Sequence, residues 1–342
     1  MESFLDKIAD FGSVAIVGMA KNTGKTECLN FVLGLLYKSG KSPAITSIGV
    51  DGENIDSVTH THKPEIVIRE GTWFVTSEAF YHSRRLTSEI ISVGGQQSAL
   101  GALVTAKAVT PGKAIISGPP DASSIRSMIE AFGQQGIRPV IVDGALSRKS
   151  AGAPTVTEAM VLTTGAALSP LPDEIVRRTS FLCSLADLPQ IDAETANLLT
   201  RVEKGVWGIS SDRLIDLEIP TALAIASHKG KLSDFLKNKG KTLFIAGAVT
   251  DGILSFFNSM PEAKDMTLVI RDFTCMFAGK LPYGIFTSRG GKCIVMRRPK
   301  LLGICVNPVS PAGFRVDSEA LCKKIGIATG YPCVDVRKLK AI

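Results

Sequence analysis

The sequence has no long hydrophobic run, few aromatic residues and no pattern of a cleavable leader. Its apolar runs are interrupted by glycine, threonine or charged residues, and none approaches the roughly 18–20 residues that a membrane-spanning helix needs. Residues 1–11 lack the basic segment and apolar run of a signal peptide. Aromatic residues make up only 6%, which disfavours an aromatic-rich binder of carbohydrate or single-stranded nucleic acid. These absences predict a cytoplasmic protein without a membrane segment.

Cysteine is present, but not in an arrangement typical of a disulfide framework or a zinc site. The count of seven is odd, and no C-x-x-C spacing occurs. Several cysteines lie in apolar, strand-like runs such as residues 303–306, which favours reduced core thiols. A metal site built from cysteines of the C-terminal half is the alternative.

No large excess of either charge is present. The chain has 39 Lys and Arg residues against 32 Asp and Glu, a net charge of +7 over 342 residues. Direct nucleic-acid binding needs basic residues gathered on one face, so we do not expect it from this composition. The hydrophobic content of 45% is that of a globular chain, and the length suggests about two domains.

Short apolar segments alternate with amphipathic ones, which is typical of parallel α/β layers. The first expected strand is 14–17, the first helix is 25–37, and 160–162 is the last strand of this part. The break at 169–172 predicts a P-loop nucleotide-binding domain with a mostly parallel sheet over residues 1–168. A second α/β domain of unassigned chemistry, a candidate for partner binding, is expected over 169–342. Its expected strands are 206–209, 222–226, 243–246, 268–270, 294–296 and 303–306.

The strongest chemical signal is a glycine–lysine loop, residues 18–26, between the first strand and the first helix. Backbone N–H groups in such a loop can surround phosphates at the positive end of the helix. Lys25 is expected to reach the β- and γ-phosphates, and the Thr26 hydroxyl to bind Mg²⁺. The alternative is a plain strand–turn–helix. The residues expected to bind the nucleotide are Gly18, Ala20, Lys21, Asn22, Thr23, Gly24, Lys25, Thr26 and Glu27.

The spacing of this loop resembles one branch of the P-loop proteins. Five residues separate Gly18 from Gly24, as in dethiobiotin synthetase and the cobyrinic acid amidases of the ParA/MinD-like branch. Lys21 corresponds to the additional signature lysine of that branch, but it lies one position short of the pattern. We therefore favour a solvated loop lysine at this position over one that reaches across a dimer.

Aspartates that follow strands are the candidate metal and water ligands, because the carboxyl ends of strands border the ligand crevice of open α/β sheets. Asp51 follows the second strand and is expected to hold Mg²⁺ or orient the attacking water. Asp143 ends a strand of Walker-B type and is the other candidate for Mg²⁺. Asp121 is a weaker candidate, because an aspartate there is also typical of a helix cap. The absence of N-K-x-D favours ATP over GTP.

Histidines and paired arginines give weaker signals. His60 and His62 would point the same way in an extended chain and could share a metal, but a polar loop is the commoner structure for such a segment. The pairs at 84–85 and 297–298 are candidates for contacts with phosphate or a partner, although solvated surface is the simpler interpretation.

Six segments together resemble one family, the smaller P-loop subunit of the lysine 5,6-aminomutase reactivase. They are IVGMAKNTGKTE (16–27), TSIGVDGE (46–53), HKPE (62–65), GTWFVTS (71–77), LVIRDFT (268–274) and VNPVSP (306–311). The resemblance implies an ATP-dependent, chaperone-like factor that acts on an adenosylcobalamin-dependent aminomutase when its cofactor is damaged. It also implies a larger, MutS-like subunit as partner.

Two other functions remain open from the residues alone. A ligase or kinase like dethiobiotin synthetase shares the loop spacing and the aspartate at a strand end, and would activate a small carboxylate. A nucleotide-gated binding module would bind ATP without hydrolysing it.

Overall fold

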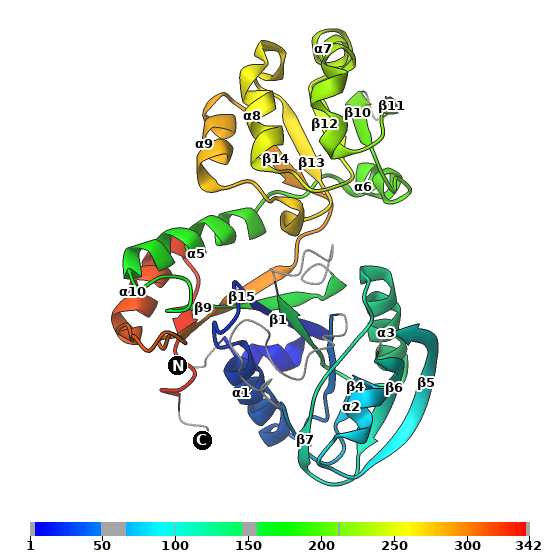
Figure 1. Ribbon diagram of the computed structural model, residues 1–342, viewed down its shortest axis with the longest axis vertical. Coiled ribbons are helices and arrows are strands. Elements are labelled where there is room, and N and C mark those ends of the chain that lie inside the picture. The colour runs from blue at the N-terminus through cyan, green and yellow to red at the C-terminus, as the bar shows by residue number, and fades with distance from the viewer. Residues whose placement is uncertain (1–3, 49–65, 99, 146–155, 211–212, 340–342) are drawn as a thin grey trace. The chain divides into compact units, whose positions relative to one another are not determined.

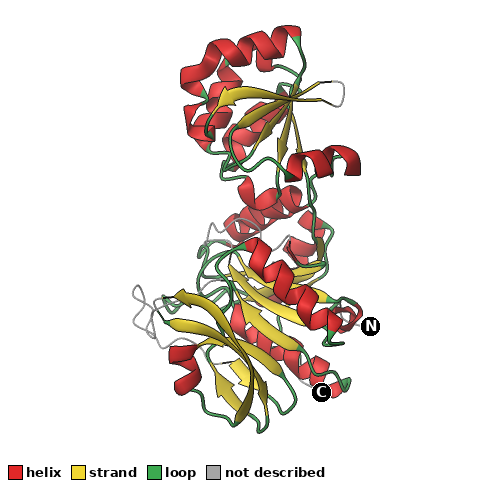
Figure 2. Ribbon diagram, turned by 90° about the vertical axis from the view of Figure 1, so that its right-hand side faces the viewer, coloured by secondary structure: helices red, strands yellow, loops and turns green. Residues whose placement is uncertain are grey.

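The computed structural model describes residues 4–48, 66–98, 100–145, 156–210 and 213–339. The chain divides into two compact units. The first consists of Met1–Ser180 together with Pro299–Ile342, and the second of Phe181–Arg298. The expected domain of residues 169–342 is therefore wrong in extent, because its last part belongs to the first unit. In Figure 2 each unit has its own sheet.

The first unit contains a nine-stranded, mostly parallel sheet, as the sequence predicts (Figure 1). Seven neighbouring strands are parallel. In sheet order they are β16 (Cys333–Val334), β15 (Lys300–Asn307), β9 (Ala159–Gly165), β1 (Ser13–Gly18), β8 (Val140–Ala145), β2 (Ala44–Ser47) and β4 (Trp73–Ser77). An antiparallel pair, β6 (Gly101–Ala108) and β5 (Ser88–Ser98), extends the sheet beyond β4.

Strand β15 explains why the last 44 residues rejoin the first unit. It pairs in parallel with β9, with Ile304 opposite Leu162 and Asn307 opposite Gly165. It also buries Cys305 and Val306. Strand β9 is consequently an interior strand and not the last one of this sheet. Because the second unit lies between β9 and β15 in the sequence, composition along the chain does not indicate that the two strands pair.

The centre of the first unit is a continuous apolar strand covered by the helix that follows it. All six residues of β1 are buried, as expected for a parallel strand with both faces covered. Helix α1 (Lys25–Lys38) packs Leu29, Val32 and Leu33 into the same core as Ile16. Burial of each such side chain contributes about 1.5–3 kcal/mol, so this core fixes where β1 ends and α1 begins.

The remaining elements of the first unit surround this sheet. Strands β3 (Ile66–Ile68) and β7 (Gly112–Ala114) form a separate antiparallel pair. The shorter helices are η1 (Asp6–Asp10) and α2 (Glu78–His82). The longer ones are α3 (Ala122–Gln134) and α10 (Ser318–Thr329), and α5 (Pro172–Ala186) continues across the boundary into the second unit.

The second unit is a five-stranded mixed sheet with helices, which confirms its expected α/β class. The order is β11 (Arg213–Ile219), β10 (Val206–Ser210), β12 (Thr242–Ile245), β13 (Thr267–Ile270) and β14 (Lys292–Val295). The last three strands are parallel, whereas β10 is antiparallel to both of its neighbours. The helices are α6 (Ala193–Thr200), α7 (Lys229–Asn238), α8 (Asp251–Ser259) and α9 (Lys280–Ser288), with short 3-10 turns η2 (Ala222–Ala224), η3 (Ala226–His228), η4 (Pro261–Ala263) and η5 (Phe273–Cys275).

One expected strand of the second unit is wrong. Residues 222–226 form the 3-10 turns η2 and η3. Pro220 lacks a backbone N–H and follows β11 directly, so the chain leaves the sheet there. In the described parts of both units, the helices are too short or too polar to cross a bilayer.

Candidate functional site

The glycine–lysine loop joins β1 to α1 at the carboxyl edge of the parallel strands in the first unit (Figure 1). Gly24 is the N-cap residue of α1 and brings no side-chain cap. Because the first N–H groups of a helix have no intrahelical partner, those at Lys25, Thr26 and Glu27 are donors at this edge. The helix dipole adds partial positive charge at the same place.

The loop backbone is left-handed at two positions. Asn22 has φ of 63° and Gly24 has φ of 86°. Asparagine is among the few side chains that tolerate this region, and glycine enters it without steric cost. A Cβ on Gly24 would also lie 2.8 Å from the Cβ of Asn307. Position 24 therefore requires glycine for two separate reasons.

The loop is held by contacts to the neighbouring strand β9. Thr23 is 1% exposed, and its Oγ1 donates to the Ala20 carbonyl at 2.9 Å. That oxygen also lies 3.1 Å from the Thr163 hydroxyl oxygen. The Met19 N–H donates to the Thr163 carbonyl at 3.0 Å. These bonds keep the loop in one conformation, so its donors are in place before any ligand arrives.

Lys25 and Asp143 form an ion pair beside the loop. Lys25 Nζ lies 3.0 Å from Asp143 Oδ1, and both side chains are partly exposed, at 27% and 20%. Asp143 is opposite Ile16 in the β1–β8 pairing, one strand away from the loop. Its Oδ1 is shielded from solvent and receives no aligned hydrogen bond from the described residues. A lysine and a carboxylate thus share the edge at which the loop donors lie.

The other expected site aspartates have different outcomes. Asp51 lies outside the described residues, as do His60 and His62. Asp121 is the N-cap residue of α3 and accepts from the Ser124 N–H at 2.9 Å. Hydrogen bonds from the Ser123 hydroxyl, and then from Ser124, lower the pKa of Asp121 to about 2. The capping alternative therefore explains this residue.

The remaining loop residues take ordinary positions at the start of α1. Lys21 is exposed, and Thr26 is partly buried in the first helical turn. The Glu27 carboxylate is exposed, and its Oε1 lies 3.1 Å from Arg337 Nη2. Among the described residues, no hydrogen bond or ion pair joins Ala20 or Glu27 to Lys25 or Asp143.

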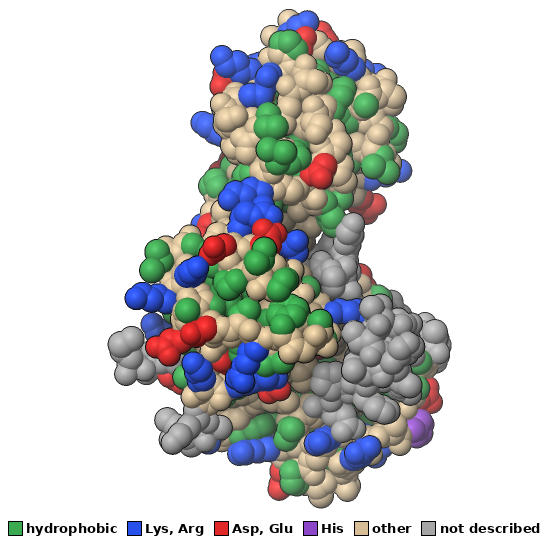
Figure 3. Space-filling view, turned by 60° about the vertical axis from the view of Figure 1, so that its left-hand side comes forward, with side chains coloured by type: hydrophobic (Ala, Val, Ile, Leu, Met, Phe, Trp, Pro, Cys, Tyr) green, Lys and Arg blue, Asp and Glu red, His purple; other side chains and the backbone are tan. Residues whose placement is uncertain are grey.

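One arginine of each expected pair, Arg84 and Arg298, has a structural partner. Arg84 stacks on the Tyr81 ring at 3.7 Å and donates to the Ser88 hydroxyl at 2.9 Å. Arg298 pairs with Asp187 at 2.6 Å in the second unit. On the face shown in Figure 3, Lys and Arg side chains are interspersed with Asp and Glu. These contacts account for Arg84 and Arg298 without a phosphate or a partner protein.

All seven cysteines lie in the described part of the chain, and none forms a disulfide. Cys28 of α1 and Cys305 of β15 are buried with their sulfurs 3.2 Å apart. Burial raises the pKa of Cys275 and of Cys293 to about 12, so both stay protonated at neutral pH. Within the described ranges, no group of three or more His, Cys, Asp or Glu side chains is arranged to hold a metal.

Sequence reasoning missed two residues that shape the loop. Thr163 lies opposite Gly18 in the last pair between β1 and β9, and Asn307 is the last residue of β15. The Nδ2 of Asn307 donates to the Asn22 carbonyl at 2.9 Å. The available signal was a polar residue at the end of an apolar strand, but nothing in the sequence connects position 307 with position 22.

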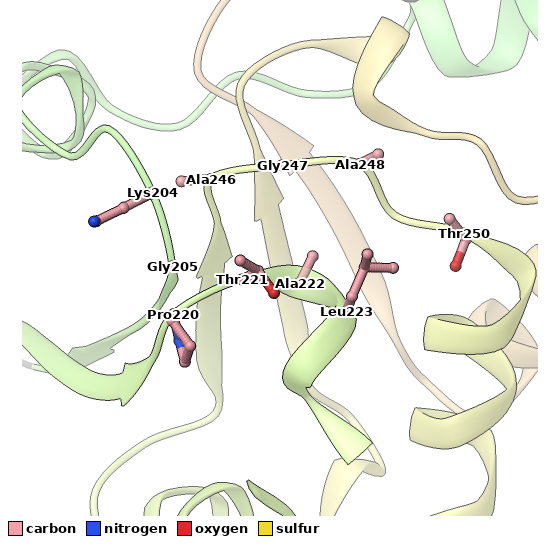
Figure 4. A pocket seen from close by; sticks show the side chains of 10 residues that line it. All are labelled: Lys204, Gly205, Pro220, Thr221, Ala222, Leu223, Ala246, Gly247, Ala248 and Thr250. Carbon is pink, nitrogen blue, oxygen red and sulfur yellow. The ribbon is translucent and has the colours of Figure 1, made fainter. Parts of the chain in front are cut away.

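The second unit has a cavity of about 300 Å³. It lies where the loop between β12 and α8 faces the segment after β11 (Figure 4). Gly247, Ala248 and Thr250 line it from the first segment, and Thr221 and Leu223 from the second. This cavity belongs to the second unit alone and contains none of the expected site residues.

Comparisons with protein families, with curated proteins and with solved structures gave no match to this chain.

Proposed function

We propose that this protein binds ATP with Mg²⁺ at the glycine–lysine loop and hydrolyses it. The observation that carries the proposal is the Lys25–Asp143 pair, 3.0 Å apart, at the start of a helix whose preceding loop is left-handed at Asn22 and Gly24. A lysine, a carboxylate and a loop of backbone donors at one sheet edge match what a nucleoside triphosphate and its metal require.

The residues at this edge fit both groups chemically. Mg²⁺ prefers hard oxygen ligands, which the Thr26 hydroxyl and the Asp143 carboxylate can provide. The Oδ1 of Asp143 is shielded from solvent and lies 3.0 Å from Lys25 Nζ, so the carboxylate is held beside the lysine. The glycine at position 24 lets the loop backbone pass close to Asn307, since a Cβ there would lie 2.8 Å from the Asn307 Cβ. Asp51 remains our candidate for orienting the attacking water and a further candidate ligand of Mg²⁺.

The proposed reaction is γ-phosphoryl transfer to water. When bound, the metal neutralises charge on the phosphate oxygens. The protein's part is positioning and charge stabilisation: the loop N–H groups hold the phosphates, and the Lys25 ammonium balances the charge that develops on them. The preformed loop means that little reorganisation is needed at the moment of reaction.

The binding step is tested by calorimetric titration of MgATP into the purified protein and by phosphate release. We expect saturable binding and slow basal turnover, both reduced by Lys25→Ala. Equal ATP affinity in the variant and the unaltered protein would contradict the site. Unchanged turnover with weakened binding would instead favour the binding module that does not hydrolyse ATP. The same titration with GTP tests the expected preference for ATP.

We further propose that the ATPase serves as the smaller subunit of a reactivating factor for an adenosylcobalamin-dependent aminomutase. This role rests on the resemblance of the six sequence segments to the aminomutase reactivase. In it, ATP binding or hydrolysis would loosen the mutase so that damaged cobalamin leaves and intact cofactor enters. A larger, MutS-like subunit would be the partner.

The reactivating role is tested with the inactivated mutase, the larger subunit, ATP and fresh adenosylcobalamin. Recovery of mutase activity that needs this protein and its Lys25 supports it. No recovery with any nucleotide would exclude it. Phosphate release that depends strictly on a small carboxylate would identify the ligase or kinase alternative.

A further inference from the structure

Asn307 is the last residue of β15, the strand that follows the second unit in the chain, and its side chain is held at both ends. Its Nδ2 donates to the Asn22 carbonyl at 2.9 Å, across 285 positions of sequence. Its Oδ1 accepts from the Val309 N–H at 3.2 Å. Its main-chain carbonyl accepts from the Ala166 N–H at 2.9 Å. The amide group is thus locked in orientation, with its donor side on the glycine–lysine loop.

Two glycines make room for this residue. A Cβ on Gly24 would lie 2.8 Å from the Asn307 Cβ, and one on Gly165 would lie 1.9 Å from the Asn307 carbonyl oxygen. Gly165 has φ of 151°. Backbone from both the loop and the end of β9 therefore approaches Asn307 more closely than any side-chain-bearing residue would allow.

The bond to Asn22 also determines where the next N–H points. In a trans peptide the carbonyl and the N–H point in opposite directions. Holding the Asn22 carbonyl on Asn307 therefore turns the Thr23 N–H away from Asn307. Thr23 is 1% exposed, and nothing in the described part of the chain accepts a hydrogen bond from its N–H. A buried N–H without a partner is costly, so this N–H is a donor for an acceptor beyond the described residues.

We infer that Asn307 is a positioning residue of the glycine–lysine loop: by holding the Asn22 carbonyl, it aims the Thr23 N–H at an anionic ligand. The inference rests on the proposed function for the nature of that ligand, which is a phosphate group of the nucleotide. It makes the nucleotide site composite, because its loop comes from the beginning of the chain and its positioning residue from the strand that follows the inserted unit.

Two variants of Asn307 test this, with a matched control in the second unit. Asn307→Ala removes the donor, and Asn307→Asp keeps the shape but presents a carboxylate to the Asn22 carbonyl. We expect MgATP affinity to fall about threefold to tenfold in the first variant and further in the second, with faster amide hydrogen exchange over residues 20–28. Asn258→Asp is the control, because its Nδ2 donates to the Pro282 carbonyl at 3.1 Å in a similar bond elsewhere. It should change neither readout.

The outcomes separate this inference from the proposed function. If both Asn307 variants bind MgATP normally and exchange their loop amides at the normal rate, the inference is overturned. If the unaltered protein does not bind MgATP but the variants still loosen the loop, the positioning stands and the nucleotide proposal fails. If the variants do not fold, amide hydrogen exchange is measured in the unaltered protein with and without MgATP. If MgATP binds but does not slow exchange of the Thr23 amide, the inference is overturned.

Discussion

Each unit contains a glycine-bearing loop between a buried parallel strand and a helix, but the two loops are built differently. The loop of the first unit is left-handed at Asn22 and Gly24 and ends on Lys25, which pairs with Asp143. The loop between β12 and α8 bends without a left-handed residue and leads into Asp251, whose Oδ1 accepts from the Gly279 N–H at 2.7 Å. A helix N-terminus is common to both, so it does not by itself distinguish a phosphate site.

The backbone hydrogen bonds that hold the two loops also differ. In the second unit, Val249 donates to the Cys275 carbonyl at 2.8 Å and accepts from Phe277 at 2.7 Å, so its loop continues the sheet. In the first unit the contacts to Thr163 and Asn307 hold the loop while leaving the Thr23 N–H without an acceptor among the described residues. The described contacts therefore bond the backbone of the second loop on both sides of Val249, whereas in the first loop they leave the backbone donor at Thr23 unused.

The largest expected effect is that of Lys25→Ala. Removal of a charged donor from a phosphate costs about 1.5–3 kcal/mol, which corresponds to roughly a 10- to 150-fold loss of MgATP affinity. Calorimetric titration measures it. Lys204→Ala is the matched control, because Lys204 lines the cavity of the second unit. If the two variants lost MgATP affinity equally, the loop of the first unit would not be the specific nucleotide site.

The second-largest effect is expected for Asp143→Asn. Loss of the carboxylate removes a candidate Mg²⁺ ligand and the partner of Lys25, so we expect Mg²⁺-dependent phosphate release to fall about tenfold or more. Nucleotide affinity should fall less. Asp187→Asn removes an ion pair of similar length, 2.6 Å to Arg298, from the second unit and should leave release unchanged. Full activity of Asp143→Asn would remove this residue from the site.

The two loop glycines offer the sharpest structural contrast. Gly24→Ala meets both a left-handed backbone and the Asn307 Cβ, and should lower the free energy of unfolding of the first unit by about 1–3 kcal/mol. Gly247→Ala meets only the Ala222 Cβ at 3.7 Å, an ordinary contact, and should be nearly neutral for the second unit.

Tryptophan fluorescence can follow each unit separately during denaturation by urea. Trp73 lies in the first unit and Trp207 in the second, and the chain has no other tryptophan. Unfolding is therefore followed through Trp73 in a Trp207→Phe background and through Trp207 in a Trp73→Phe background. Similar losses for the two glycine variants would show that the loop of the first unit is not under special steric demand.

The smallest effect is expected for Asp121→Ala. It removes the N-cap of α3, which should cost the first unit about 0.5–2 kcal/mol and leave ATP hydrolysis unchanged. Because the pKa of Asp121 is lowered to about 2 in the fold, its contribution is present above the unfolded value near 4. The contribution is lost as the pH falls toward 2. The ring centroids of Trp73 and of Phe132 in α3 lie 6.1 Å apart, so Trp73 fluorescence reports the unfolding of the first unit. A large loss of hydrolysis would return Asp121 to the site.

Much of the fold was predictable from local pattern. The expected strand 14–17 and helix 25–37 appear as β1 and α1, whereas the strand expected to end at Asp143 continues as β8 to Ala145. The meeting of Lys25 with Asp143 follows from the rule that carboxyl ends of parallel strands share an edge. The boundary at residue 168 was wrong, because the return of β15 to β9 depends on pairing between segments that the second unit separates.

By itself, the sequence determined where the loop begins and ends and which of its residues carry charge. Periodicity, the glycine at 24 and the apolar run of β1 are local properties that act over a few residues. Only the tertiary structure decided that Asn307 holds the Asn22 carbonyl and that Asp121 caps a helix. The Asn307–Asn22 contact joins residues 285 positions apart. For Asp121 the sequence left two roles open, a ligand at the site and a helix cap, and the structure shows the cap. Hydrogen-bond geometry distinguishes the two uses of Asp121, and the Asn307 contact exists only once β15 has paired with β9.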